Sequence, residues 1–147
     1  MGNKSVNLTP EDLLALAQMV YGENAGEDIA TQKMTAQTAI NRLRSGRTKE
    51  FGSTIPEVLQ KGYYAVSKNS PMYQQAKSGN FPDVSSRAKF GEIKKLIEST
   101  VADQDYGNAM FYFRPEEEED LRKNPKKFNF NLVKPQGRVG VYNTYSY

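Results

Sequence analysis

The segment from Tyr21 to Glu27 contains the residue types that point most directly to chemistry. Its sequence is Tyr-Gly-Glu-Asn-Ala-Gly-Glu, with Glu23 at the end of an apolar stretch, between two glycines and close to a tyrosine. Burial against apolar and aromatic groups disfavours an ionised carboxylate and raises its pKa. Such a carboxyl group stays protonated near neutral pH and serves as a general acid. The alternative is that Glu23 is a solvated residue or a cap at a helix end.

The 147-residue chain contains neither histidine nor cysteine. Their absence excludes the Ser-His-Asp and Cys-His mechanisms, the usual zinc sites, disulfides and thiol nucleophiles. Acid–base chemistry must therefore come from Asp, Glu, Tyr or Lys. We expect a site built on carboxyl groups, with no metal and no cofactor.

The charge and hydropathy of the chain bear on its partners. The net charge of +3 favours an anionic partner such as cell wall, nucleic acid or a membrane surface, or is ordinary solubility charge. Short basic pairs such as Lys94-Lys95 have no aromatic residues between them, so we expect no nucleic-acid binding. No apolar run approaches the roughly 20 residues of a membrane span, so we expect no membrane insertion. Residues 1–8 lack the apolar core of a signal peptide, which predicts synthesis in the cytoplasm unless a leader was trimmed.

The helix signals predict a single domain over residues 9–147, preceded by a flexible N-terminus over residues 1–8. Thr9 and Pro10 predict the start of a first helix, which Gly22 weakens at its end. Asp28 predicts the cap of a second, largely buried helix that runs to about Arg44. Residues 53–57, with Thr54 before Pro56, predict the start of a third helix that Gly62 ends. Ser70 and Pro71 predict a fourth that Gly79 ends, and Ser85 or Ser86 predicts a fifth that runs to about residue 103.

The C-terminal part has a different character. The aromatic run 109–113 predicts a strand that Pro115 ends, and the acidic run 116–120 predicts the start of a short surface helix. Residues 138–142 predict another strand, paired across a turn at residues 135–137. Five helices and a small C-terminal sheet make an α+β fold that is mainly helical.

Four segments in the same order resemble the SleB-type cell-wall hydrolase family, named after the spore cortex-lytic enzymes. Residues 21–27 are similar to its Y-(G/A)-E-A-x-G-E segment, and the helix ending at Asn41-Arg42 is similar to its helix of small residues ending in NR. Residues 54–64 are similar to its TI-x-x-V-(I/L) and Q-x-G-x-F segments. Residues 107–115 are similar to G-(G/A/N)-A-x-Y-F-x-(N/R)-P. The resemblance covers residues 13–115 and extends more loosely to 142.

This resemblance implies a lysozyme-like or lytic-transglycosylase-like domain that cuts peptidoglycan between N-acetylmuramic acid and N-acetylglucosamine. The family's catalytic acid falls on Glu23. In a lytic transglycosylase one Glu both protonates the leaving oxygen and takes the proton of the sugar's 6-hydroxyl. In a hydrolase a second carboxylate is needed, and Glu27 is the candidate. The competing hypothesis for Glu27 is that it caps the next helix together with Asp28.

The same resemblance suggests residues that contact the glycan. Tyr64 and Tyr112 have rings that stack on sugars or hydroxyls that donate to them, although Tyr112 also fits simple strand packing. Asn41, on an apolar helix face, needs hydrogen-bond partners and either ties down the turn after the first helix or holds a sugar amide. Gln60 either contacts glycan or lies on the surface of a helix end. The predicted substrate-binding residues are Tyr21, Asn41, Gln60, Tyr64 and Tyr112.

Two departures from the family pattern affect these expectations. The family's Gln after the glycine is replaced by Tyr63, and its G-x-H-x-F segment is matched by residues 140–145 without the histidine. The segment 62–86 also differs, which predicts a reshaped substrate groove. The resemblance and the lack of a signal peptide suggest a phage or prophage lysin released by a holin partner or carried on a particle, with a mature secreted bacterial enzyme as the alternative source. The alternative is a non-catalytic virion protein that keeps the fold and binds wall polymer.

Overall fold

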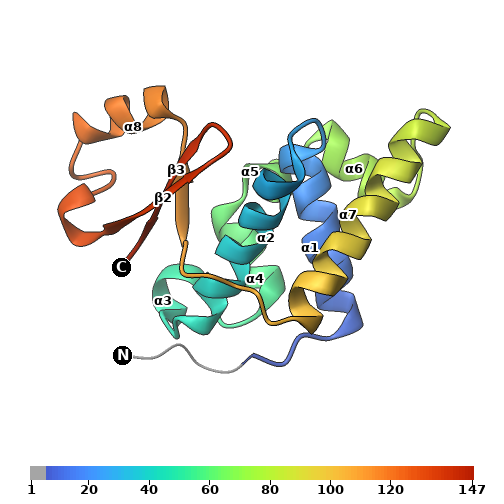
Figure 1. The fold of residues 1–147 in the computed structure, drawn as a ribbon, viewed down its shortest axis with the longest axis horizontal. Helices are drawn as coiled ribbons and strands as arrows, with labels where there is room; N and C mark the ends of the chain where they lie inside the picture. Colours follow the sequence, from blue (N-terminus) through green and yellow to red (C-terminus); the bar gives the residue numbers. More distant parts are fainter. Residues whose placement is uncertain (1–5) are drawn as a thin grey trace.

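The computed structural model describes residues 6–147, so the first five residues of the predicted flexible N-terminus lie outside it. It confirms a mainly helical α+β fold with a small antiparallel sheet near the C-terminus (Figure 1). None of the helices in the described part has the length and apolarity needed to cross a bilayer. The helices are α1 (Pro10–Asn24), α2 (Ile29–Arg44), α3 (Thr48–Phe51), α4 (Ile55–Gly62), α5 (Tyr64–Ser67), α6 (Pro71–Ser78), α7 (Val84–Ala102) and α8 (Pro115–Arg122), with a 3₁₀ turn at Phe130–Leu132, and the strands are β1 (Phe111–Phe113), β2 (Lys134–Val139) and β3 (Tyr142–Ser146).

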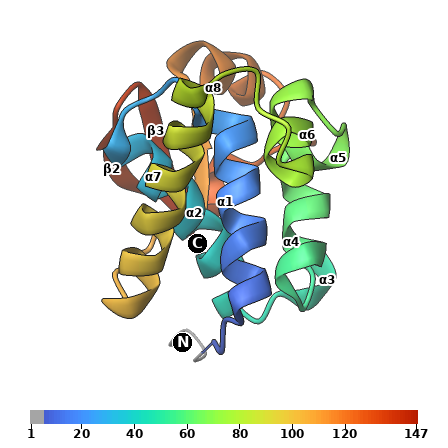
Figure 2. The same cartoon turned by 90° about the vertical axis from the view of Figure 1, so that its right-hand side faces the viewer.

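Helix α1 is the central element of the helical part. It packs against α2 and against α4 to α7, and Figure 2 shows it between α7 on one side and α4 and α6 on the other. Thr9 starts it with a capping box, in which Thr9 and Asp12 each accept a bond from the other's backbone N–H. Leu16, Met19 and Val20 have no solvent exposure. The C-terminal turn of α1, which carries Glu23, is therefore held inside a shell of other helices.

The sequence suggested that Gly22 weakens the end of α1, but the helix continues past it to Asn24. A glycine is needed at this position because two other helices come close to its backbone. A Cβ atom at Gly22 would lie 2.8 Å from Cβ of Ala65 and 3.0 Å from Cβ of Tyr73. The missing side chain therefore lets α5 and α6 reach the last turn of α1.

We expect Gly22→Ala to lower the free energy of unfolding by about 1–3 kcal/mol, because the added carbon overpacks this contact. The better helix propensity of alanine, about 1 kcal/mol, offsets part of this loss. Urea denaturation measures the change. The matched control is Gly91→Ala in α7, where nothing lies within 4 Å of the new Cβ. Adding Ala65→Gly to Gly22→Ala removes the nearest carbon and is expected to recover stability; equal behaviour of Gly22→Ala and Gly91→Ala would contradict this.

The sheet has the strand order β1-β3-β2, with antiparallel pairing throughout. The predicted strand 138–142 and the predicted turn at 135–137 are wrong. Pro135 lies inside β2, at a register shift, and is tolerated there because β2 is an edge strand. The chain reverses instead at Gly140, whose φ is +56°. A Cβ atom at Gly140 would clash with Thr31 Oγ1, so the tip of the hairpin rests on the first turn of α2.

The remaining helix starts follow the sequence with a few differences. Asp28, Thr54 and Ser70 cap α2, α4 and α6 as their positions suggested. Helix α7 begins earlier than predicted, because Asp83 caps it by accepting a 2.7 Å bond from the backbone N–H of Ser86. The acidic run forms α8. The four-residue helices α3 and α5 were not predicted, because so short a segment shows no periodicity.

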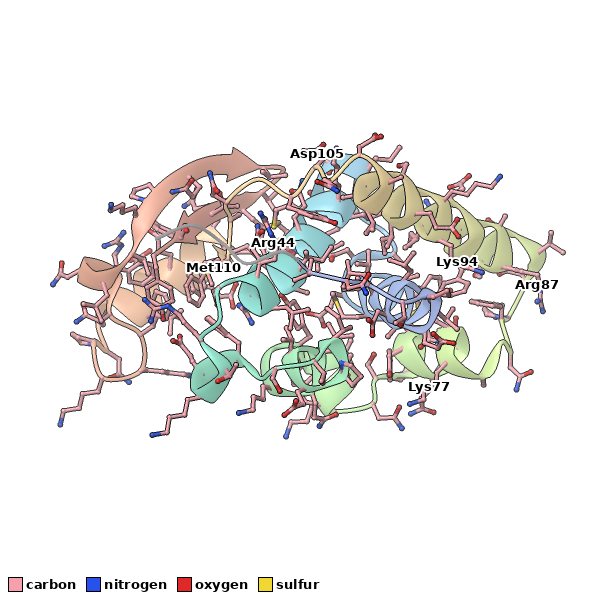
Figure 3. All side chains as sticks on the ribbon, turned by 90° about the horizontal axis from the view of Figure 1, so that it is seen from below. Arg44, Lys77, Arg87, Lys94, Asp105 and Met110 are labelled. Atoms are coloured by element: carbon pink, nitrogen blue, oxygen red, sulfur yellow. The ribbon has the colours of Figure 1, made fainter. Side chains whose placement is uncertain are left out.

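Side chains of α2 hold the segment between α7 and β1. Asn41 Nδ2 donates to the carbonyl oxygens of Tyr106 and Ala109 at 2.8 and 2.9 Å. Figure 3 shows the course of this segment, which is marked by Asp105 and Met110 with Arg44 of α2 beside it. The segment leads directly into β1, so α2 sets the position of β1. The other contacts are Lys33 to the Asp105 carboxylate, Gln37 Nε2 to Asp105 O at 2.6 Å and Arg42 Nε to Met110 O at 2.8 Å.

Candidate active site

Glu23 lies in the last turn of α1, where the helical part meets the sheet, and its side chain is partly buried. Its Oε2 accepts a 2.8 Å hydrogen bond from the backbone N–H of Ala65, in the first turn of α5. Its Oε1 accepts a longer bond, 3.4 Å, from the hydroxyl of Tyr112 on β1. The close approach at Gly22 brings α5 to this carboxyl group, and the anchoring of β1 by α2 brings Tyr112.

Burial is the largest influence on the Glu23 carboxyl and raises its pKa above the ordinary value. The hydrogen bonds from Ala65 and Tyr112 act in the opposite direction, because they stabilise the charged form. The negative charge of Glu27 again raises the pKa. The net result is a carboxyl group that keeps its proton to a higher pH than a solvated glutamate, as a general acid requires.

Tyr112 both packs in the sheet and presents its hydroxyl to the site, the two possibilities that the sequence left open. Its ring packs edge-on against that of Tyr142, with centroids 5.2 Å apart. Its hydroxyl faces Glu23. Burial, and then the charges of Tyr63 and Glu23, raise the pKa of Tyr112 well above 10. Tyr112 therefore remains an O–H donor at neutral pH and well into the alkaline range.

Glu27 does not cap α2, because Asp28 alone accepts the bond from Thr31 N, at 2.7 Å. Both oxygens of Glu27 are occupied by other donors. Oε1 accepts bonds from Tyr142 at 2.8 Å and from Arg114 at 3.0 Å. Oε2 accepts one from Asn24 at 2.7 Å. The structure thus makes Glu27 the centre of a polar network one turn beyond Glu23.

This network predicts a measurable titration of Tyr142. Burial raises the pKa of Tyr142 to about 12, and the hydrogen bond and charge of Glu27 add to the effect. Glu27→Gln removes that charge, so the pKa of Tyr142 is expected to fall toward 10. NMR titration of ring-labelled tyrosine measures it, with Glu119→Gln on the exposed face of α8 as the control. An unchanged Tyr142 pKa in Glu27→Gln would rule out this contact.

Asn24 was not identified from the sequence, although it lies inside the Tyr21–Glu27 segment. Its side chain is 2% exposed, and its amide N–H donates to Glu27, which fixes the orientation of the amide group. The amide oxygen is then buried without a hydrogen-bond partner in the described residues. Gln32 supports the same turn by donating to the carbonyl oxygens of Asn24 and Glu27, each at 3.2 Å. An unpaired buried acceptor costs about 1–3 kcal/mol, so this turn is not arranged for stability alone.

Two predicted substrate contacts lie elsewhere. Tyr21 is 1% exposed, packs edge-on against Phe81 and Phe90, and donates its hydroxyl to Gln75 at 3.0 Å. Residues two apart on a helix point to different faces, so Tyr21 belongs to the core while Glu23 faces the site. Asn41 is also 1% exposed, and its bonds to the segment before β1 leave its amide occupied. It neither ties down the turn after α1 nor reaches Glu23.

The other two predicted contacts lie on the surface. Tyr64 is 69% exposed and directly precedes Ala65, whose N–H binds Glu23, so it stands at the edge of the site. Gln60 is exposed on α4. The structure therefore brings together Glu23, Glu27 and Tyr112, adds partners that the sequence did not indicate, and leaves Tyr21 and Asn41 as structural residues. The added partners are Asn24, the Ala65 backbone, Arg114 and Tyr142.

Within residues 6–147, no three acidic side chains gather in an arrangement that fits a metal ion. No protein-family model matches the chain, and neither does any curated protein or solved structure.

Proposed function

We propose that this protein cleaves the glycan strands of peptidoglycan between N-acetylmuramic acid and N-acetylglucosamine, with Glu23 as the general acid. The observation that carries the proposal is the Glu23 carboxyl itself. It is partly buried, its pKa is raised, and it is held between the Ala65 N–H and the Tyr112 hydroxyl. The motifs that resemble the SleB-type family supply the substrate class.

The mechanism that best fits this site is that of a lytic transglycosylase. Protonated Glu23 donates its proton to the glycosidic oxygen, and the bond from that oxygen to C1 of the muramic acid breaks. The resulting carboxylate then accepts the proton of the muramic 6-hydroxyl, whose oxygen forms a new bond to C1. This closes the anhydro ring and restores the acid without consuming water. Ala65 and Tyr112 stabilise the carboxylate during the interval in which it is charged.

The surroundings of Glu27 support a single catalytic carboxyl group. Three donors contact its two oxygens, one of them the guanidinium of Arg114. Most of its acceptor capacity is therefore used within the protein rather than on a sugar or a water. Its charge instead helps to keep Glu23 protonated. A muramidase that uses Glu27 as its second carboxylate is the alternative, and it would release reducing ends rather than anhydro ends.

Tyr142 stands where the family pattern has a histidine. It stands in the segment Gly140-Val141-Tyr142, where the family pattern has G-x-H. Its hydroxyl reaches Glu27 at 2.8 Å, and the close approach at Gly140 places it there. At the position of the family's histidine, Tyr142 thus supplies a hydrogen bond to Glu27. This contact supports a catalytic protein over a fold retained only for binding.

We place this activity in cell-wall lysis, as a phage or prophage lysin that a holin releases or a particle carries. The test is to incubate the protein with purified cell-wall sacculi and to measure the release of soluble fragments. Release is expected. Sedimentation of the protein with the sacculi without any release would instead support the non-catalytic, wall-binding virion protein.

A further inference from the structure

A concave surface lies next to the site, between the start of α2 and one face of α7. It is a groove of about 1020 Å³. Asp28 and Ile29 line it from α2, and Lys89, Glu92 and Lys95 line it from α7. The two helices lie on either side of α1 in Figure 1, and Figure 2 shows α7 as an outer element. The volume corresponds to that of a typical small-ligand site.

The groove is chemically mixed. The side chains of Lys89, Glu92 and Lys95 form no ion pair with any described residue. Ile29 is 69% exposed at the opposite wall. A ligand that suits this surface carries carboxylates for the two lysines, an amino group for Asp28 or Glu92, and a small apolar group for Ile29.

The length of the groove indicates the size of this ligand. Its α7 wall runs from Lys89 to Ser99, ten residues along a helix, which is about 15 Å at a rise of 1.5 Å per residue. An extended peptide advances about 3.3–3.6 Å per residue, so four or five residues span this distance. The lining holds two lysines and three acids, Glu27, Asp28 and Glu92. The charge pattern and the length together therefore describe a short peptide that carries both carboxylates and amino groups.

We propose that this groove binds the peptide branch of peptidoglycan, an inference that rests on the function proposed above. Such branches are short, contain small apolar residues, and carry both carboxylates and the amino group of a diamino acid. Glu27 connects the two places, because it lines the groove and also belongs to the network beside Glu23. A branch that leaves the muramic acid near Glu23 therefore enters the groove at the end where Glu27 lies.

The test is a binding titration that does not depend on catalysis. A synthetic tetrapeptide with a diamino acid as its third residue is added to the isotope-labelled protein, and backbone NMR shifts are followed at low salt. Shifts are expected in the first turn of α2 and along α7. In Lys89→Gln/Lys95→Gln the dissociation constant is expected to rise about tenfold or more, which is about 1.4 kcal/mol. Lys94→Gln is the matched control, because Lys94 lies on α7 (Figure 3) but does not line the groove. It is expected to change the constant less than twofold.

Shifts confined to other surfaces, or equal binding by the double variant and the control, would overturn the inference. A comparison of two glycan substrates tests the peptide groove separately from the proposed function. The wild type is expected to cleave glycan strands that carry peptides faster than strands stripped by an amidase, and the double variant is expected to lose that preference while it still cleaves stripped strands. Peptide binding in the groove without cleavage of either substrate would refute the proposed function alone, whereas cleavage of both at equal rates would refute the peptide groove alone.

Discussion

Glu23→Gln is expected to lower the rate of glycan cleavage by about 10²–10⁴-fold, the contribution typical of a positioned general acid. Glutamine has nearly the same shape and still offers an oxygen to the Ala65 N–H, but it has no acidic proton to donate. The rate of fragment release from sacculi measures the loss. Glu119→Gln is the control, because it makes the same chemical change on an exposed turn of α8 and is expected to leave the rate unchanged.

The same variant makes a prediction about stability that separates lost chemistry from lost folding. Because burial raises the pKa of Glu23, this group favours the folded state fully below its ordinary pKa of 4.5, and that stabilisation is lost as the pH rises through the folded-state pKa. Gln does not ionise, so the variant escapes this loss. Its melting temperature at pH 7 is expected to equal or exceed that of the wild type, and its relative advantage is expected to shrink toward pH 4. A variant that is inactive because it is less stable at pH 7 would not support Glu23 as the acid.

Asn41→Ala is expected to have the largest effect on stability, a loss of about 3 kcal/mol in the free energy of unfolding. The substitution leaves two carbonyl oxygens without their donor, that of Tyr106 in a buried bond and that of Ala109 in a partly buried one. A buried acceptor that loses its partner costs about 1–3 kcal/mol. It also releases the segment that positions β1 and Tyr112. Chemical denaturation measures the first effect, and the cleavage rate below the melting transition measures the second.

Gln37→Ala is the matched control for Asn41→Ala. Gln37 also donates from α2 to the same segment, at 2.6 Å to Asp105 O, but this bond is exposed to solvent. Water replaces an exposed donor, so the loss is expected to stay below about 1 kcal/mol. Equal losses in the two variants would mean that Asn41 does not anchor the segment through its buried amide.

The features that the sequence predicted well depend on neighbours in the chain. Thr9, Asp28, Thr54 and Ser70 cap helices because a short polar side chain accepts a bond from a backbone N–H two or three residues later. The local setting of Glu23, at the end of an apolar helix with glycine before it, is of the same kind. These signals were sufficient for the mainly helical α+β fold and for the position of the candidate acid.

The features that were missed depend on contacts between distant parts of the chain. Glu27 meets Arg114 and Tyr142, which are 87 and 115 residues away, and no local pattern signals such pairs. Gly22 suggested a helix end, although its function is to admit Ala65.

The environment of Arg42 is of the same kind. Its guanidinium carbon lies 5.0–5.3 Å from the centres of three rings, which stabilise it through cation–π contacts. The rings are those of Phe51, Tyr63 and Phe111. The arginine needs no acidic partner there because the aromatic faces and the carbonyl oxygen of Met110 surround it.

The most direct test of the central claim is to digest purified glycan strands with the wild type, Glu23→Gln and Glu27→Gln, and to identify the products by mass spectrometry. We expect the wild type to release products that end in anhydro-muramic acid, Glu23→Gln to release none, and Glu27→Gln to release the same anhydro products more slowly. Reducing ends from the wild type would show that water attacks the sugar and would require a second carboxylate. Cleavage by Glu23→Gln at the wild-type rate would contradict the assignment of Glu23 as the acid.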